Sequence, residues 1–242
     1  EEVILGVSWD LLYVVFMAIV VLLVVHAIVM AALAKKDLDR PTADGRKVVR
    51  HEAVDRWFHW LMAVSILALI FTGVSPILGL RIAWLDLHWM SGLLLTFLVV
   101  AHIIRASFWQ DFKSMLLVPK DFGEPFDSSR KPGKYYFEQK GMHWAVTVVT
   151  LAVIVTGVLM FMQIDTPFWD RTNSMAEDQL GLVFLLHGLS TLALVALAAT
   201  HIYFALRPEK IYYTRAMISG WMSEDELAAN HDPAQWSPKE AD

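Results

Sequence analysis

Cysteine is absent from the 242 residues of this chain. Its absence excludes disulfides, iron–sulfur clusters held by cysteine thiolates and covalent c-type haem attachment within the chain. Charge is also scarce, because Asp, Glu, Lys and Arg make up only 19% of the residues. The sequence contains no glycine-rich nucleotide-binding motif, no catalytic triad and no block of basic residues suited to nucleic acid. These absences argue against nucleotide and nucleic-acid binding.

Hydrophobic residues dominate instead, at 56% of the chain with a mean hydropathy of +0.47, above the 45–50% or so of soluble domains. Five stretches contain no charged residue: Leu11–Ala34, Trp57–Leu80, Leu87–Ile104, Gly141–Ile164 and Gln179–Leu206. Each is long enough to cross a hydrocarbon core of about 30 Å as a helix. Membrane strands would alternate apolar and polar residues, which these runs do not. We therefore predict an all-α membrane protein with five transmembrane helices.

Basic residues are distributed unevenly between the ends of these stretches. All but two of the 20 Lys and Arg residues fall in segments 35–56, 105–140 and 207–239, which share one side if every stretch crosses the membrane. Only Arg81 and Arg171 fall on the other side. Because basic residues accumulate on the cytoplasmic side, we expect the N-terminus outside and the C-terminus in the cytoplasm.

Histidines recur at one spacing. His88 and His102 lie 14 residues apart in the third stretch, and His187 and His201 lie 14 apart in the fifth. In an α-helix, 14 residues advance about 1400°, roughly 40° short of four turns, so both members of a pair face nearly the same side, about 21 Å apart along the axis. Two such helices facing each other can hold two cofactors at two depths. The pattern predicts two haem groups held by histidine.

The expected topology gives each histidine a depth. His88 and His187 alone lie in the outer half of the stretches, so one pair of ligands is available for an outer haem. In the inner half, His201 has two possible partners, His59 and His102, and the spacing does not decide between them. Zinc is the rival ligand, but it requires three or four ligands converging within about 2 Å of one point, whereas these histidines spread over half a membrane.

Two arginines lie one helical turn from inner histidines. Arg56 precedes His59 by three residues, and Arg105 follows His102 by three. Each could pair with a haem propionate, because Arg binds carboxylates in a bidentate manner. The bias of basic residues toward the cytoplasm also explains both arginines and is the simpler interpretation.

Several stretches around these histidines match a known pattern, in order along the chain. They are Asp55-Arg-Trp-Phe-His59-Trp60, Leu87-His88 leading to Gly92, Gly133-Lys-Tyr-Tyr-Phe-Glu-Gln-Lys140, Leu186-His187 through His201-Ile-Tyr203, and the tail from Gly220-Trp221 through His231-Asp-Pro233 to Trp236. Together they resemble the cytochrome b (gamma) subunit of membrane-bound formate dehydrogenase, within a broader family that includes the cytochrome b subunits of nickel–iron hydrogenases. The resemblance covers roughly residues 50–236.

The resemblance implies a di-haem four-helix bundle formed by the second to fifth stretches, preceded by an extra N-terminal helix. It implies two haem b groups, with His59 and His201 holding the inner iron and His88 and His187 the outer one. His102 is then the alternative inner ligand. We accordingly divide the chain into an extra transmembrane helix (1–36), a di-haem cytochrome b domain (37–210) and a cytoplasmic C-terminal tail (211–242).

The same family binds quinone near the turn that begins at Gly133, which implies Tyr136, Gln139 and Lys140 as contacts for menaquinone or ubiquinone. Two positions depart from the family pattern, because Tyr136 stands in place of an asparagine and Glu138 in place of a glycine. The contact with quinone is therefore altered here. An aromatic belt at the membrane surface also explains the tyrosines of this turn.

These observations predict a membrane-anchor cytochrome b subunit of a respiratory oxidoreductase complex in a bacterial or archaeal inner membrane. Electrons would pass between an iron–sulfur subunit, docked with a catalytic subunit on the outer (periplasmic) face, and quinone on the cytoplasmic side, in either direction. One alternative is a haem-free or single-haem anchor that only docks a catalytic subunit and binds quinone. Another is a transporter with proton-relay histidines, but the third and fifth helices run parallel, unlike an inverted repeat.

Overall fold

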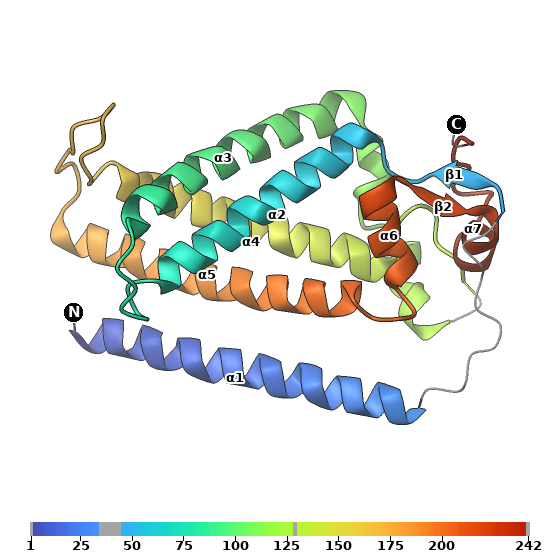
Figure 1. Cartoon of the computed structure of the whole chain (residues 1–242), viewed down its shortest axis with the longest axis horizontal. Helices are drawn as coiled ribbons and strands as arrows, with labels where there is room; N and C mark the ends of the chain where they lie inside the picture. Colours follow the sequence, from blue (N-terminus) through green and yellow to red (C-terminus); the bar gives the residue numbers. More distant parts are fainter. Residues whose placement is uncertain (1, 34–44, 128–129, 241–242) are drawn as a thin grey trace. The chain divides into compact units, whose positions relative to one another are not determined.

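Five long helices dominate the structure, a computed structural model that describes residues 2–33, 45–127 and 130–240 (Figure 1). They are α1 (Glu2–Leu33), α2 (Ala53–Val74), α3 (Trp84–Trp109), α4 (Phe137–Phe161) and α5 (Glu177–Ala205). Each contains a segment long and apolar enough to cross a membrane. The prediction of five membrane-length helices is confirmed for the described part of the chain.

The helix ends differ from the ends of the uncharged stretches. Helix α2 ends at Val74 rather than Leu80, and Ser75 closes it by donating both its backbone N–H and its hydroxyl to Phe71 O. Pro76 follows at once and cannot continue the helix, because it lacks an N–H. Helix α3 is longer than its uncharged stretch, since it includes Asp86 and Arg105 near its two ends.

The chain folds into two compact units. Unit 1 comprises Glu1–Val29, Ala63–Phe97 and Ala145–Thr200, and unit 2 comprises Met30–Met62, Leu98–Trp144 and His201–Asp242. Each of the helices α2 to α5 therefore contributes one part to unit 1 and the other part to unit 2.

Unit 1 buries several small hydroxyl residues and exposes many large apolar side chains. Its buried side chains include four small hydroxyl residues on the helices, Ser65, Thr72, Thr150 and Thr156. Large apolar side chains such as Phe97 are exposed instead, at 69% of the residue surface. A soluble bundle would show the reverse distribution, so this pattern favours a unit surrounded by lipid. Leu95 and Leu194, almost fully buried, form part of the remaining apolar core.

Unit 2 carries the short elements outside the membrane-length helices. Two 3₁₀ helices, η1 (Phe112–Met115) and η2 (Pro119–Phe126), precede α4, and α6 (Ile211–Ser219), β2 (Trp221–Ser223) and α7 (Glu224–Asn230) follow α5. Strand β1 (Lys47–Val49) pairs antiparallel with β2, with Val48 opposite Met222. The all-α prediction did not include this ribbon.

Gly220 makes the turn between α6 and β2. It adopts a left-handed φ of 94°, and its N–H donates to Ala216 O to close α6. Its own carbonyl accepts the N–H groups of Arg50 and His51 at 2.9 and 3.1 Å. A Cβ here would lie 3.0 Å from His51 O, so both the conformation and the space require glycine.

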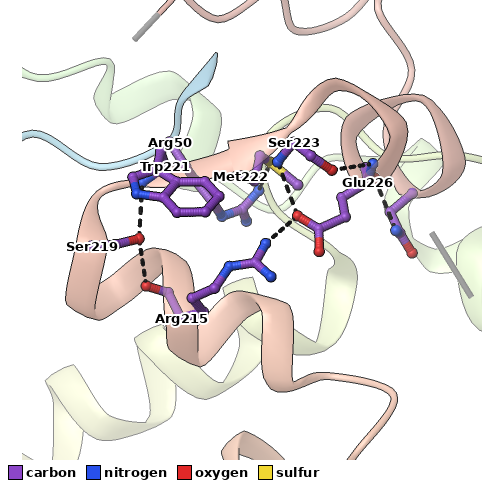
Figure 2. Close-up of polar contacts among 8 residues, drawn as sticks. Arg50, Arg215, Ser219, Trp221, Met222, Ser223 and Glu226 are labelled. Carbon is purple, nitrogen blue, oxygen red and sulfur yellow. Dashed lines mark hydrogen bonds and ion pairs between the residues drawn. The ribbon is translucent and has the colours of Figure 1, made fainter. Parts of the chain in front are cut away.

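A buried carboxylate ties β2 to α7 and α6 (Figure 2). Ser223 caps α7, because its hydroxyl accepts from Glu226 N while Glu226 accepts from Ser223 N at 2.9 Å. Such reciprocal capping satisfies two helix-end donors. Arg215 of α6 donates to the same Glu226 carboxylate. The segment from α6 to α7 is therefore folded, and β1 is paired with it. These four elements, β1, α6, β2 and α7, are called the cap below.

Candidate haem sites

The first pair of facing histidines lies in unit 1. His88 on α3 and His187 on α5 have ring centres 6.3 Å apart and planes at 72°. A metal atom about 2.0 Å from one nitrogen of each of two imidazoles places the ring centres roughly 6.2 Å apart when the bonds are collinear. The spacing of this first pair suits two axial ligands of one haem iron.

Two threonines fix the orientation of these rings. Thr72 Oγ1 lies 2.9 Å from His88 Nδ1 and donates its single proton to Ala68 O at 2.7 Å. It must therefore accept from His88 Nδ1–H. Thr156 has the same relation to His187, at 2.9 Å, while it donates to Ala152 O.

This contact leaves Nε2 of both rings as the lone-pair nitrogen. Metal-bound histidines usually donate their other ring N–H to a protein acceptor, which fixes ring orientation and raises ligand basicity. The sequence analysis did not single out either threonine. Each is followed by a glycine, Gly73 or Gly157, whose Cβ would lie 3.6 or 3.4 Å from the ring carbon Cε1 of the neighbouring histidine. Each ring therefore rests directly against the backbone of the adjacent helix.

The second pair lies in unit 2. His59 on α2 and His201 on α5 have ring centres 6.1 Å apart with planes at 60°. Trp60, which follows His59, contacts the His59 ring edge-on and donates its indole N–H to Met217 O at 3.1 Å. The spacing matches that of the first pair, so these two rings also suit one haem iron.

His102, the alternative inner ligand, has different ring neighbours. Its ring centre lies 6.0 Å from Phe58 and 6.4 Å from His143 of α4. Its Nδ1 atom is buried and has no hydrogen-bond partner among the described residues. The described ring contacts thus join His201 with His59, and His102 with His143.

The two arginines one turn from inner histidines contact protein groups. Arg56 donates to Ile218 O at the end of α6, at 2.5 Å. Arg105 binds Asp55 at 2.9 Å and Glu52 at 3.1 Å. These contacts hold α2 and α3 to neighbouring parts of unit 2 and neutralise the charge of Arg105.

The three residues expected near quinone organise the start of α4. Tyr136 donates its hydroxyl to Asn230 O at 2.8 Å, and its backbone N–H donates to Gln139 Oε1 at 3.1 Å. Gln139 thus caps the first turn of α4. Lys140 forms an ion pair with Asp121 of η2 at 2.8 Å, with side-chain exposures of 9% and 2%. Burial is the main factor that raises the pKa of Tyr136.

An arginine–histidine pair that the sequence analysis did not single out lies at the centre of the cap. Arg50, 2% exposed, donates to Lys134 O at 2.8 Å and to Nε2 of fully buried His231 at 2.9 Å. His231 Nδ1 donates to Gly133 O at 2.6 Å, so its ring is neutral. Aromatic rings surround the guanidinium: Tyr135, Tyr213 and Trp236.

The pKa values of the cap histidines follow from this arrangement. Burial lowers the pKa of His231 to about 4, and the charge of Arg50 acts in the same direction. Burial and Arg50 also lower the pKa of His51, to about 2. Burial raises the pKa of Tyr213. Arg50 is therefore the charged centre of a group that is otherwise neutral at pH 7.

The fold and these sites define a class: helical membrane proteins whose long apolar helices carry facing pairs of histidines. Residues 50–220 match the family model described as prokaryotic cytochrome b561, and the chain belongs to that family. It is 24% identical over 212 residues to a protein of Haemophilus influenzae named formate dehydrogenase, cytochrome b556 subunit, covering 80% of this chain and 84% of that relative. It is 25% identical over 206 residues to the cytochrome b556(fdo) subunit of formate dehydrogenase from Escherichia coli K12, covering 77% and 90%.

Membership of this family identifies the chain as a membrane cytochrome b with a role in electron transfer, and it implies haem b as the cofactor. The ring-centre spacings of the two pairs fit that group, and the Thr72 and Thr156 contacts leave Nε2 as the lone-pair nitrogen of His88 and His187. The five apolar helices agree with a bacterial membrane protein.

Proposed function

We propose that this chain is the membrane subunit of a respiratory oxidoreductase complex and holds haem b at the first and second pairs. It transfers electrons between an iron–sulfur subunit, docked with a catalytic subunit at the outer face, and quinone at the cytoplasmic face. The observation that supports this most directly is the spacing of the two pairs, 6.3 Å for His88 and His187 and 6.1 Å for His59 and His201.

Haem b, when bound, supplies reversible one-electron transfer. The residues of the chain determine how it does so. Each histidine pair would hold one iron with two imidazoles and leave no open position on it, which suits electron transfer rather than oxygen binding. Thr72 and Thr156 hold the protons of His88 and His187 on Nδ1, so the ligating nitrogens stay free of protons.

As the partner of His201 at the inner haem, His59 is better supported than His102. The ring of His59 faces His201 at 6.1 Å, whereas the described ring contacts of His102 are with Phe58 and His143. The assignment of His59 with His201 therefore agrees with the one that the family resemblance implies.

The quinone site is proposed at the turn before α4. Tyr136 and Gln139 hold this turn through bonds to Asn230 O and to the backbone, and the ion pair of Lys140 with Asp121 fixes it to η2. We propose that these residues form a rigid wall beside the quinone head group. Protons for a quinol would then come from the cytoplasm. Moving one charge across 100 mV corresponds to about 2.3 kcal/mol. Electron transfer from the outer face to quinone at the cytoplasmic face would therefore conserve energy.

The subunit role rests on the relatives, which are named as cytochrome b556 subunits of formate dehydrogenase. We propose that this chain also works beside a catalytic subunit and an iron–sulfur subunit. The orientation with the N-terminus outside follows from the basic residues, all but two of which lie on one side.

Haem quantification of the purified full chain tests the proposal. His88→Ala and His59→Ala should each lower the pyridine haemochrome content by one haem per chain, and the double variant by two. A colourless wild-type protein would show a haem-free anchor and overturn the proposal. Loss of all haem from either single variant, with native folding retained, would contradict the assignment of two separate pairs.

A further inference from the structure

The helices α2 and α3 repeat in α4 and α5, and the repeat covers every histidine of the pairs. His59-Trp60 and Thr72-Gly73 of α2 recur 84 residues later as His143-Trp144 and Thr156-Gly157 of α4. On α3 and α5 the offset is 99: Leu87-His88 recurs as Leu186-His187, and His102-Ile103 as His201-Ile202. The chain thus contains two parallel copies of one two-helix motif.

The contacts within each unit repeat as well. In unit 1, the Thr72 contact with His88 and the Thr156 contact with His187 both measure 2.9 Å. In unit 2, Trp60 donates to Met217 O at 3.1 Å and Trp144 donates to Met115 O at 3.0 Å. Equivalent positions therefore have equivalent surroundings.

The repeat dictates how the histidines pair. When each residue is replaced by its equivalent in the other copy, His88 becomes His187 and His187 becomes His88, so the first pair is unchanged. The same exchange turns His59–His201 into His143–His102, so the second pair has a counterpart. The structure contains that counterpart, with ring centres 6.4 Å apart and planes at 68°. We propose that His102 and His143 are the axial ligands of a third haem b, which we call the third pair.

Distance separates this interpretation from a simple hydrogen bond. A direct N–H···N bond of about 2.9 Å would bring two imidazole centres to roughly 5 Å or less. At 6.4 Å the rings of His102 and His143 are too far apart for that bond and close to the roughly 6.2 Å that a bridging metal requires. The buried Nδ1 of His102 has no hydrogen-bond partner among the described residues, so this site contains a polar atom whose bonding capacity is unused.

The ligand count favours haem over a bare metal ion. Zinc and similar ions take four protein or water ligands. Among residues 2–33, 45–127 and 130–240, no group of three or more His, Asp or Glu side chains is arranged to hold a metal. Haem brings four nitrogens of its own and needs only two axial imidazoles. A pair of histidines is therefore sufficient for haem and insufficient for a bare ion.

The third pair extends the proposed function, because it rests on the assignment of the second pair as haem ligands. His143 lies one helical turn after Gln139, so the third haem would be next to the turn proposed for quinone. It would act as a further one-electron carrier beside that turn.

Haem stoichiometry of the purified full chain decides the question. The expected result is three haems per wild-type chain. His102→Ala, His143→Ala and the double variant should each retain two, because both residues hold the same group. His59→Ala should also retain two, and His59→Ala combined with His102→Ala only one. His26→Ala, outside the internal repeat, is the control and should keep three.

Two wild-type haems that both survive His102→Ala would overturn the third site and leave the proposed function intact. Two haems, one lost with His102→Ala and none with His59→Ala, would overturn the third site and the second-pair assignment. A haem-free wild type would overturn both proposals.

If His102→Ala does not fold, His102→Met supplies a second measurement. Methionine can remain an axial ligand and raises the reduction potential of haem iron. One haem of three should then shift to a higher midpoint potential while the haem count stays at three. An unchanged redox titration with full haem content would overturn the third site.

Discussion

Thr72 Oγ1 lies 2.9 Å from His88 Nδ1 and must accept its proton, because the hydroxyl proton of Thr72 is directed to Ala68 O. The relation is duplicated by Thr156 and His187. A hydroxyl that would otherwise only bond its own helix thereby sets the tautomer of a proposed haem ligand on a neighbouring helix. The threonines are buried and uncharged, so they do this without placing a carboxylate in the membrane.

Thr72→Val should weaken haem binding at the first pair by about 10–100-fold, the usual effect of removing such a partner. Valine keeps the shape of threonine but cannot accept the Nδ1 proton. Haem transfer to an apoprotein acceptor, followed spectroscopically, measures the change. Thr96→Val is the matched control, because the Thr96 hydroxyl bonds to Gly92 O of its own helix. Equal haem retention in the two variants would contradict the assigned role.

The Lys140–Asp121 pair should behave as a buried ion pair. Asp121→Ala leaves Lys140 buried without its partner and should lower the free energy of unfolding by about 3–5 kcal/mol. Replacing both residues, Asp121→Leu with Lys140→Met, should recover most of this loss, apart from the bond from Val118 N to Asp121. Thermal unfolding of the purified chain in detergent measures both.

The control for that pair is an exposed one. Asp127 and Arg130 lie 3.1 Å apart with side-chain exposures of 44% and 55%. Asp127→Ala should cost less than about 1 kcal/mol, because water screens such pairs. If Asp127→Ala and Asp121→Ala destabilised the chain equally, burial of the Lys140–Asp121 pair would not explain the loss of stability in Asp121→Ala.

The cap should lose stability as pH falls. His231 has a pKa of about 4 in the folded protein, and an unfolded histidine has one near 6.5. The folded state therefore binds fewer protons than the unfolded state between these values. The free energy of unfolding should fall as pH is lowered from 6.5 toward 4, by at most about 1.4 kcal/mol per pH unit for this residue. His51 acts in the same direction.

Hydrogen–deuterium exchange of residues 221–236, corrected for the intrinsic pH dependence of exchange, measures this effect. Protection should decrease below pH 6.5 in the wild type. His231→Gln, which cannot take up a proton, should reduce the dependence while leaving the contribution of His51. A wild-type protection that is constant from pH 7 to pH 5 would refute the role of these buried histidines.

Gly220→Ala should destabilise the cap more than Gly79→Ala destabilises its turn. Both glycines have left-handed φ, 94° and 66°, which costs an alanine about 1–2 kcal/mol. At Gly220 the new methyl group would also lie 3.0 Å from His51 O, whereas at Gly79 it would meet nothing within 4 Å. Unfolding midpoints of the two variants measure the difference. Similar midpoints would show that the close approach to His51 is unimportant.

The sequence predicted the long helices because an uncharged run and a membrane-length helix share one cause, the cost of charge in hydrocarbon. It misplaced the end of α2, where Pro76 stops the helix while the residues up to Leu80 remain uncharged. It did not predict the pairing of β1 with β2. Strands of three residues, such as Lys47–Val49, carry too little alternation to be recognised, and their partners lie more than 170 residues away.

Depth alone predicted His88 and His187 as one pair, whereas it did not predict that His102 faces His143. The equal spacing of His88–His102 and His187–His201 indicated ligands on α3 and α5, but His102 faces His143, which lies on α4. The signal that was present is the repeated His-Trp and Thr-Gly of α2 and α4. This repeat relates α2 to α4, whereas the 14-residue spacing relates histidines within α3 and within α5. A search for one spacing within one helix therefore does not find the repeat.

The β1–β2 ribbon has a consequence for the order in which the chain assembles. Val48 emerges from the ribosome long before its partner Met222, and Arg50 long before His231. All five membrane-length helices are synthesised between or before these partners, so the cap can close only after the last helix has been made. Contacts so distant in sequence form late and slowly. Completion of the cap therefore reports that all five membrane-length helices have already been made.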